Sequence, residues 1–290
     1  MFKRISCFTL CLILFSGICV QQVVAAGNET NISSSTNPEP VEVQTDKPAE
    51  PALYVDGILV EHGSLIYRDD TPYVSLRYAA MAFRPDATVT WTGDYALIKA
   101  EGLTITVDPD LNYIVANDRY LYLPEGVFYE NGMIRIPVRM MTKIFDAEYS
   151  LDPVTKDIFV TTGSGTIIHG SEFYNKDDLY WLSHIINAES GNQPLNGKIA
   201  VGNVVLNRVA DPVFPNSIYG VIHQKNQFSP VKNGTIKLTP NEESILAAKL
   251  CLDGAVVLPT ALWFNSTKSN SWAAKHKTYI TTIGGHAFYV

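Results

Sequence analysis

Glu189 is the residue of this 290-residue chain whose position best suits acid–base chemistry. It continues a series of apolar residues at helical spacing, formed by Leu179, Leu182 and Ile186. The other side of the same helix is hardly polar, so the helix is expected to be largely buried. Desolvation and the negative end of the helix dipole both penalise a charged carboxylate and raise its pKa. Glu189 is therefore a candidate general acid. The alternative is a surface glutamate, the commoner place for this residue type.

Other catalytic and metal-binding patterns are absent from the sequence. His184, His223 and His276 do not have the spacing of zinc ligands, and no Gly-x-Ser-x-Gly motif of a serine hydrolase occurs. Cys251 falls in an amphipathic segment and is most simply a small core residue. The chain is therefore expected to hold no metal and no cofactor.

The elements that position Glu189 can be predicted around it. A helix begins near residue 178 with Asp177 as its cap, and Gly191 in the left-handed conformation ends it. A second helix, residues 197–209, is apolar nearly all round and is expected at the centre of the core. Ala200 and Gly202 would let a neighbouring helix approach it closely.

Three further elements follow towards the C-terminus. Residues 217–223 form a short helix, and another helix runs to Gly254 from a start with Thr239 as N-cap and Pro240 at the first helical position. Residues 279–283 and 286–289 form a hairpin with Gly284 and Gly285 in its turn.

Six motifs follow one another along residues 176–290: INAESGN, GKIAVGNVVLNRV, FPNSIYGVIHQKNQFSPV, LTPNEESILAAKLCLDG, ALWFN and TTIGGHAFYV. In their sequence and order they resemble the cell wall hydrolases of the SleB and CwlJ type, the spore cortex-lytic enzymes. Glu189, in the first of these motifs, falls on the family's catalytic glutamate. One departure is that Asn192 and Gln193 stand where family members often have an acidic residue.

The resemblance implies a mainly helical, lysozyme-like domain that cuts peptidoglycan between N-acetylmuramic acid and N-acetylglucosamine. Such enzymes are lytic transglycosylases, with spore cortex lysis in germination as one setting. One carboxyl protonates the glycosidic oxygen, and its carboxylate then takes the proton of the sugar's own C6 hydroxyl as that hydroxyl attacks C1. The product is a 1,6-anhydro end, and the expected partner is a peptidoglycan glycan strand.

A muramidase that uses water instead needs a second carboxylate about 5–5.5 Å or about 6.5–9.5 Å from the first. Most other acids of the segment lie at helix ends: Asp177, Asp178, Glu242, Glu243 and Asp253. Asp211, in a turn beside a proline, is the one acid that stays a candidate. Hydrolysis with Asp211 is therefore an alternative, and so is a wall-binding or spore-coat protein without catalytic activity.

Residues for sugar subsites can also be named from the resemblance. Aromatic side chains offer flat faces for sugar rings, whereas amides and hydroxyls offer hydrogen bonds for acetamido groups. The candidates are Gln227, Phe228, Ser229, Trp263, Phe264, Asn265 and His286. For Phe228 and Phe264, the alternative is packing in the core.

Residues 52–162 are rich in predicted strands, such as 103–107 and 158–162. They also repeat weakly: YVSLR at 73–77 and RIPVR at 135–139 each precede a short helix, an Asp-Ala turn and a strand. This pattern resembles the N-terminal domain of copper amine oxidases. No copper is expected, because His62 is the segment's only histidine. Arg77 and Arg139 are expected to fix turns or form surface ion pairs, and attachment to substrate or wall is a role by analogy.

The N-terminus has the pattern of a secretory signal. Lys3 and Arg4 precede an uncharged apolar run, and Ala25 and Ala26 offer a cleavage site. The run is shorter than the ~20 residues of a membrane-spanning helix, so no span is expected after cleavage. The next segment, residues 27–51, contains four prolines and no aromatic residue, which predicts a flexible tail.

The predicted organisation has five parts: a signal peptide over residues 1–26, the tail over 27–51, the β-rich module over 52–162, a linker over 163–175 and the hydrolase domain over 176–290. The fold class is α+β, with a small β-rich module and a mainly helical catalytic domain that has a short hairpin. The formal net charge of −7 argues against binding to nucleic acid. Export to the cell wall or spore envelope of a bacterium is expected.

Overall fold

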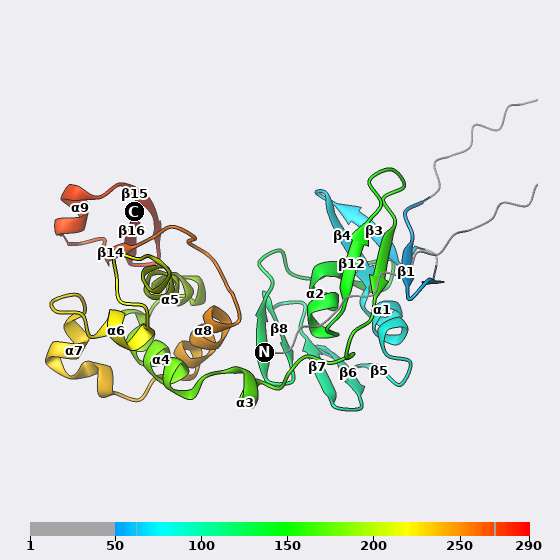
Figure 1. The fold of residues 1–290 in the computed structure, drawn as a ribbon, viewed down its shortest axis with the longest axis horizontal. Coiled ribbons are helices and arrows are strands. Elements are labelled where there is room, and N and C mark those ends of the chain that lie inside the picture. Colours follow the sequence, from blue (N-terminus) through cyan, green and yellow to red (C-terminus); the bar gives the residue numbers. More distant parts are fainter. Residues whose placement is uncertain (1–49, 62, 270) are drawn as a thin grey trace, which may run out of the picture. The chain divides into compact units, whose positions relative to one another are not determined.

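Short strands joined by tight turns make up most of residues 53–161 in the computed structural model (Figure 1). The structure describes residues 50–61, 63–269 and 271–290. The predicted signal peptide and residues 27–49 of the predicted tail lie outside this part of the chain. None of the helices within these ranges combines the length and hydropathy of a membrane-spanning segment.

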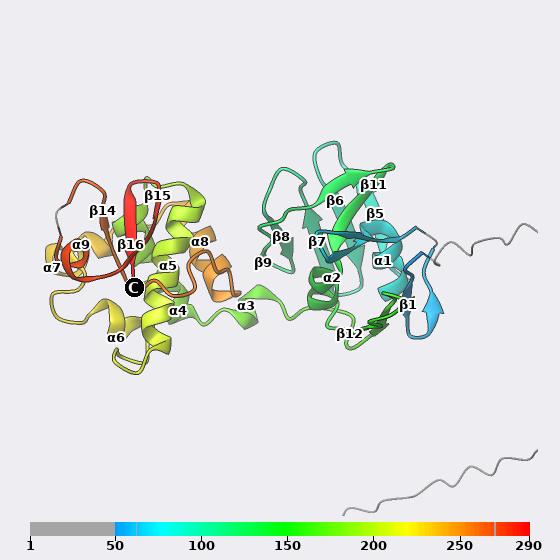
Figure 2. The ribbon, with the colours of Figure 1, turned by 90° about the horizontal axis from the view of Figure 1, so that it is seen from above.

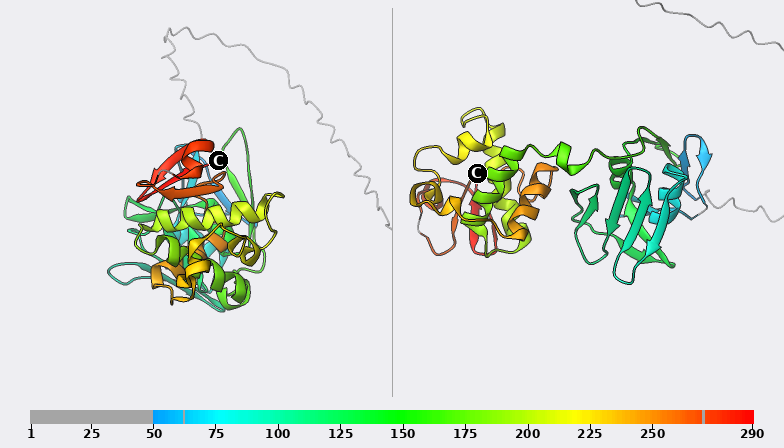
Figure 3. Two further views of the ribbon diagram at one scale, coloured as in Figure 1. Left: turned by 90° about the vertical axis from the view of Figure 1, so that its left-hand side faces the viewer. Right: turned by 90° about the horizontal axis from the view of Figure 1, so that it is seen from below.

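The strands that are described between residues 53 and 161 form three sheets. The first has the order β12-β13-β1-β2, with strands Glu148–Leu151, Ile158–Thr161, Leu53–Val55 and Ile58–Leu59. The second has the order β10-β11-β4-β3, with strands Phe128–Glu130, Met133–Pro137, Thr71–Ser75 and Leu65–Arg68. The third runs from β5 to β9, with strands Thr88–Trp91, Ala96–Ala100, Leu103–Val107, Tyr113–Ala116 and Arg119–Tyr122. The right-hand view of Figure 3 shows strands of this third sheet side by side.

The predicted repeat is visible as two strand–helix units. Strands β4 and β11 pair in antiparallel fashion, with Val74 opposite Ile136. Each leads directly into a short helix, α1 (Leu76–Phe83) or α2 (Val138–Ile144). The rings of Phe83 and Phe145, at the ends of these helices, lie 5.2 Å apart in the core of the module. The two units therefore share one hydrophobic core.

Helices dominate the second half of the chain, as the fold class α+β predicts. The helices are α3 (Gly170–Phe173), α4 (Lys176–Ser190), α5 (Leu195–Ala210), α6 (Ile218–Ile222), α7 (Ser229–Asn233), the 3-10 helix η1 (Thr235–Lys237), α8 (Glu242–Leu252) and α9 (Trp272–His276). Helix α3 lies within the predicted linker. A sheet of order β14-β16-β15 accompanies them, with strands Trp263–Ser266, His286–Tyr289 and Tyr279–Ile283. Figure 2 shows this sheet beside α5.

Helices α4, α5 and α8 pack against one another and form the centre of this half. Gly202 of α5 makes the close approach possible. A Cβ atom at this position would lie 2.6 Å from Sγ of Cys251 on α8 and 3.1 Å from Cδ1 of Ile186 on α4. Cys251 is buried, which confirms its prediction as a core residue.

Two helix starts differ from the sequence prediction. Helix α5 begins at Leu195, two residues before the predicted start. Helix α8 is capped by Asn241 and not by Thr239: the Asn241 side chain accepts a hydrogen bond from the backbone N of Ser244 at 2.8 Å. Tertiary contacts explain the choice, because Asn241 also bonds to the end of α4. The predicted hairpin is confirmed as β15 and β16, with Gly284 at φ +58° in its turn.

Candidate active site

Helix α4 carries Glu189 in its last turn, as the apolar periodicity predicts. Its N-cap is Asn175, whose side chain accepts hydrogen bonds from the backbone N of Asp177 at 2.9 Å and of Asp178 at 3.1 Å. The prediction of Asp177 as the cap is therefore wrong. Asp177 and Asp178 instead lie in the first helical turn, where their charges interact favourably with the helix dipole.

The residue after α4 has a different role from the one predicted. Gly191 adopts φ −56° and ψ −24°, so it is right-handed and not left-handed. A close approach explains the glycine: a Cβ atom here would lie 2.6 Å from the carbonyl oxygen of Asn187. The chain can therefore turn sharply just after Glu189.

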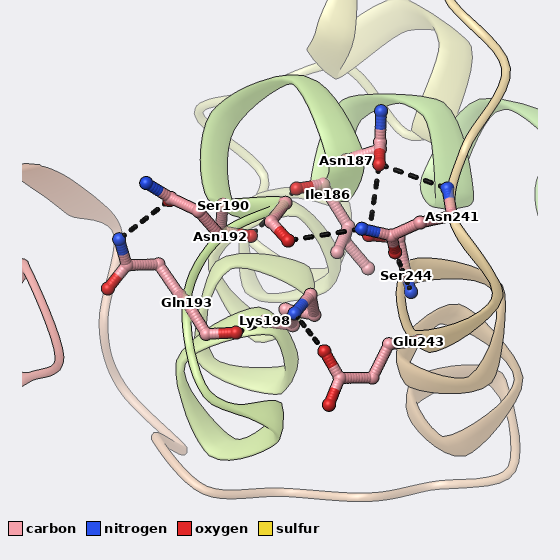
Figure 4. Close-up of polar contacts among 10 residues, drawn as sticks. Ile186, Asn187, Ser190, Asn192, Gln193, Lys198, Asn241, Glu243 and Ser244 are labelled. Carbon is pink, nitrogen blue, oxygen red and sulfur yellow. Dashed lines mark hydrogen bonds and ion pairs between the residues drawn. The ribbon is translucent and has the colours of Figure 1, made fainter.

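Hydrogen bonds fix the last turn of α4 to the start of α8 (Figure 4). The Asn187 side chain accepts from the backbone N of Asn241 at 3.1 Å and from Oγ of Ser244 at 3.3 Å. Asn241 Nδ2 donates to the carbonyl of Gly191 at 3.1 Å. The backbone is therefore fixed both before Glu189, at Asn187, and after it, at Gly191.

A second set of contacts supports the loop that follows Glu189 (Figure 4). The ammonium group of Lys198, which is fully buried on α5, forms an ion pair with Glu243 and donates to the carbonyl of Gln193. The side-chain Oε1 of Gln193 accepts from the backbone N of Gly285 at 2.6 Å. Gln193, at the position of the family departure, thus joins this loop to the β15–β16 turn.

Glu189 lines a cavity of about 580 Å³, a size typical of ligand sites. Six of the seven predicted subsite residues line the same cavity: Gln227, Phe228, Ser229, Phe264, Asn265 and His286. They come from the segment that leads into α7 and from strands β14 and β16. Phe228 also packs in the core, so it both lines the cavity and belongs to the core.

Trp263 is the predicted subsite residue that does not line this cavity. It packs against the small cluster of Ala273, Ala287 and Tyr289, and Nζ of Lys277 lies 3.6 Å from the centre of its ring. Neighbouring residues of a strand point to opposite faces, and Phe264, the next residue of β14, takes the place on the cavity wall.

Burial raises the pKa of Glu189 to about 7. Its carboxyl group forms no hydrogen bond or ion pair with any residue of the described part of the chain, so a substrate can reach it without displacing a partner. Among the described residues that line the cavity, Glu189 is the only carboxylic acid. Cationic side chains are present in the lining, namely Arg208, Lys225 and Lys232.

Two buried polar atoms in the cavity lining form no hydrogen bond with the described residues. They are Nδ1 of His286 and Oε1 of Gln224. Buried polar groups are normally satisfied, so both atoms fit a polar ligand. Burial lowers the pKa of His286. A neutral imidazole can donate one hydrogen bond and accept another.

Arg208 is a cavity residue that the sequence analysis did not select. It lies near the end of α5, is buried, and donates from Nε to the carbonyl of Leu262 at 2.7 Å and from Nη1 to Oε1 of Gln227 at 3.2 Å. Burial lowers its pKa to about 10. An arginine in a largely apolar helix is a signal that could have identified it, because charged side chains are seldom fully buried without partners.

The acids that could assist Glu189 lie elsewhere. Asp211, the predicted alternative, is not among the lining residues, and its carboxylate accepts from the backbone N of Val213 at 2.9 Å. Asp253 is buried and accepts from Arg119 and from the hydroxyl of Tyr174. In the part of the chain that the structure describes, no three His, Cys, Asp or Glu residues gather as metal ligands.

Spore cortex-lytic enzymes from several bacteria match part of the chain. Spore cortex-lytic enzymes of Bacillus cereus and of Bacillus subtilis are 34% and 32% identical to it over 116 residues, which is 40% of this chain. These matches cover 45% and 38% of the relatives' own length, so the chain spans less than half of these proteins.

Two solved structures also match part of the chain. The catalytic domain of a germination-specific lytic transglycosylase, SleB from Bacillus anthracis, is 31% identical, with a TM-score of 0.39. That match covers 43% of this chain and 100% of the solved chain. The catalytic domain of the Bacillus cereus SleB protein is 32% identical, covers 40% of this chain and 92% of its own, and has a TM-score of 0.38.

Two family models match the chain in separate regions. The model of the copper amine oxidase N-terminal domain matches residues 54–160, and the model of the cell wall hydrolase family matches residues 192–289. The second match begins just after Glu189. The chain therefore carries a domain of the copper amine oxidase N-terminal family followed by a domain of the cell wall hydrolase family.

Proposed function

We propose that the chain is an exported, peptidoglycan-cleaving lytic transglycosylase in which Glu189 is the catalytic acid and base. One observation carries the proposal: a half-buried carboxyl, with a pKa raised to about 7, lines a cavity that no other described acid lines. The names of the relatives support the spore cortex as the substrate and germination as the setting.

The first step needs a proton donor. Glu189 holds its proton near neutral pH because burial disfavours the charged carboxylate. In the proposed reaction it gives this proton to the oxygen between N-acetylmuramic acid and N-acetylglucosamine, and the C1–O bond breaks. The leaving sugar departs as a neutral alcohol, and Glu189 becomes a carboxylate.

The second step needs a base at the same place. The C6 hydroxyl of the muramic acid residue attacks C1, and the Glu189 carboxylate accepts the proton of that hydroxyl. A 1,6-anhydro ring forms, and Glu189 returns to its starting state. One carboxyl serves both steps because the nucleophile belongs to the substrate and no water has to be held by a second acid.

Polar and aromatic groups of the lining suit the sugars on either side of the bond. The rings of Phe228 and Phe264, with centroids 6.5 Å apart, offer apolar surface. Neutral His286 and the amides of Gln227 and Asn265 offer donors and acceptors for hydroxyl and acetamido groups. We assign binding roles to these residues and to Ser229.

Two alternatives predict different products. Hydrolysis with Asp211 as the second carboxylate is disfavoured by the position of Asp211 outside the cavity lining and by its bond to Val213. A wall-binding protein without activity would not need a free carboxyl whose pKa is raised. The products distinguish the transglycosylase from both alternatives. An anhydro product is lighter than a hydrolysis product by one water, and a protein without activity releases no product.

The test is mass spectrometry of purified cortex and vegetative sacculi after digestion. We expect anhydromuropeptides from the wild type and none from Glu189→Gln. Glu242→Gln, an exposed glutamate in the first turn of α8, is the matched control and should keep full activity. Reducing ends in place of anhydro ends would favour the muramidase. Full activity of Glu189→Gln would refute the assignment.

The proposed organisation of the chain supports action outside the cell. We infer a signal peptide over residues 1–26, a tail over 27–51 and a linker over 163–175 between the β-rich module of 52–162 and the catalytic domain of 176–290. Mass spectrometry of the secreted protein, with cleavage after Ala26 as the expected result, tests the first of these boundaries.

A further inference from the structure

A second cavity lies in the β-rich module. It shares no lining residue with the Glu189 cavity. It has a volume of about 350 Å³. Its walls come from the end of β4 and the start of α1, from the edge strand β5, and from the edge strand β10 with the turn that follows it. It therefore lies where the edges of two sheets meet.

Three aromatic side chains at this cavity are exposed to solvent. Trp91, Tyr129 and Tyr78 are 43%, 58% and 37% exposed. The rings of Trp91, from β5, and Tyr129, from β10, lie 6.2 Å apart at 84° to each other. Removing large apolar rings from water stabilises a fold, so rings that stay exposed around a cavity indicate a binding surface.

Polar groups beside these rings are free to bind. Arg77 on α1 lines the cavity, is exposed, and has no hydrogen-bond or ion-pair partner within residues 50–61, 63–269 and 271–290. Its counterpart in the second repeat, Arg139, is paired with Glu125. Of the two arginines predicted to fix turns or ion pairs, only Arg139 does so.

The turn between β10 and β11 adds an amide to the same cavity. Asn131 and Gly132 have positive φ angles of 51° and 75°, as a two-residue hairpin turn requires. The side chain of Asn131 lines the cavity beside Tyr129. No Asp or Glu belongs to the lining described for this cavity, so its only formal charge is the positive charge of Arg77.

We propose that this cavity, with Trp91, Tyr129, Arg77 and Asn131, is a saccharide-binding site that holds a glycan strand apart from the catalytic centre. Flat aromatic faces fit the apolar faces of pyranose rings, and the guanidinium and amide groups can donate to hydroxyl and acetamido oxygens. The lack of acids and the free Arg77 also suit a glycan that carries carboxylates. The choice of a saccharide comes from the cavity itself, whereas the choice of an N-acetylated wall glycan rests on the proposed function.

The direct test uses the full-length Glu189→Gln chain labelled with 5-fluorotryptophan. The sequence contains four tryptophans, and Trp91→Phe identifies the ¹⁹F signal of Trp91. We expect a hexamer of N-acetylglucosamine to shift this signal, and Arg77→Ala to weaken the binding seen at Trp91 about tenfold, as the loss of one good polar contact would. Lys99→Ala, an exposed cation on β6 outside the lining, should leave the binding unchanged.

A second measurement uses the active chain. Tyr129→Ala with Trp91→Ala is expected to slow digestion of insoluble sacculi about tenfold and to leave turnover of short soluble glycans unchanged. Tyr149→Ala, which removes a tyrosine of β12 that is 44% exposed, is the matched control and should behave as the wild type. Unchanged melting temperatures show that these exposed positions do not alter folding.

Several outcomes would overturn the proposal. They are a Trp91 signal that the hexamer leaves unmoved, a Tyr149→Ala variant that is as slow as the double variant, or a shift caused by wall peptides and not by glycan. Failure of the proposed catalytic function is separate, because it appears as missing anhydro products whatever the Trp91 signal does.

Discussion

Arg208 donates a hydrogen bond from Nη1 to Oε1 of Gln227, 3.2 Å away, in the wall of the Glu189 cavity. The same guanidinium bonds to the carbonyl of Leu262 and lies over the rings of Phe214 and Phe228. One side chain therefore links the end of α5, the segment before α7 and the segment before β14. Through these contacts it helps to hold Gln227 and Phe228 in the cavity wall.

Replacing Arg208 by lysine should disturb the position of Gln227 while keeping the positive charge. Lysine keeps the positive charge and loses the planar fork that reaches Leu262 and Gln227 together. We expect kcat/KM on soluble glycans to fall about tenfold to a hundredfold, because small displacements of binding groups have effects of that size.

A double-mutant cycle separates positioning from general destabilisation. If Arg208 acts through Gln227, then Arg208→Lys and Gln227→Ala together should reduce kcat/KM little more than one of them alone. Arg68→Lys, which changes an arginine over Phe128 in the β-rich module, is the control and should have no effect. Additive losses in the cycle would show that the two residues act independently.

Activity should fall as pH rises through about 7. The reacting form of Glu189 is the protonated one, and burial places its pKa at about 7. Above that value kcat/KM should drop about tenfold for each pH unit. Below it the rate should reach a plateau, because Glu189 is then already protonated. A pH profile of kcat/KM on soluble glycans measures this, and activity that rises between pH 6 and pH 8, roughly, would contradict the proposed acid.

The same carboxyl should make the fold less stable at high pH. Its ordinary pKa is 4.5 and its folded value about 7, so the folded chain holds the proton more tightly than the unfolded chain. The contribution of this group to the free energy of unfolding is fully present below pH 4.5 and is lost as the pH rises through 7. The difference corresponds to at most about 3 kcal/mol.

Glu189→Gln removes this pH dependence. The variant should melt at a higher temperature than the wild type at about pH 8, and the two should converge below about pH 4.5, where Glu189 is protonated in both states. Glu242→Gln, at an exposed helix start, should show no such pattern. Equal melting temperatures of Glu189→Gln and the wild type at pH 8 would mean that Glu189 is solvated.

The sequence predicts the position of Glu189 because helical periodicity is local. Three apolar residues at steps of three and four are enough to identify the buried face of α4. The caps were less predictable, because Asn241 is selected over Thr239 by its bonds to Gly191 and Asn187, which are far away in sequence. Only tertiary structure contains that information.

The cavity wall shows the same limit. Trp263 and Phe264 are adjacent aromatic residues, and composition alone cannot indicate which of them faces the cavity. The pairing of β14 with β16, Phe264 opposite Phe288, decides it. Arg208 was missed because its partners, Leu262 and Gln227, belong to segments that the sequence does not connect to α5.

The contact of Gly202 with Cys251 should appear as strong coupling between two core substitutions. A methyl group at position 202 would stand 2.6 Å from Sγ of Cys251, so Gly202→Ala forces α5 and α8 apart and should destabilise the fold by about 1–3 kcal/mol. Cys251→Ala removes the sulfur and leaves a small void, with a loss of about 1 kcal/mol. In the double variant the new methyl occupies that void, 3.5 Å from the Cβ of residue 251, which is an ordinary contact. The contact with Cδ1 of Ile186 at 3.1 Å stays tight, so the relief is partial.

The double variant should therefore be more stable than the sum of the two single effects predicts, by about 1 kcal/mol or more. Urea unfolding followed by near-ultraviolet circular dichroism, with all four chains under the same conditions, measures this coupling. Gly234→Ala is the control, because Gly234 has open space around it but a φ angle of +82°. Its loss of stability should arise from backbone strain alone and should be the same with and without Cys251→Ala. If Gly202→Ala and Cys251→Ala are additive, the helices have room to separate and the close packing of α5 on α8 is not required for stability.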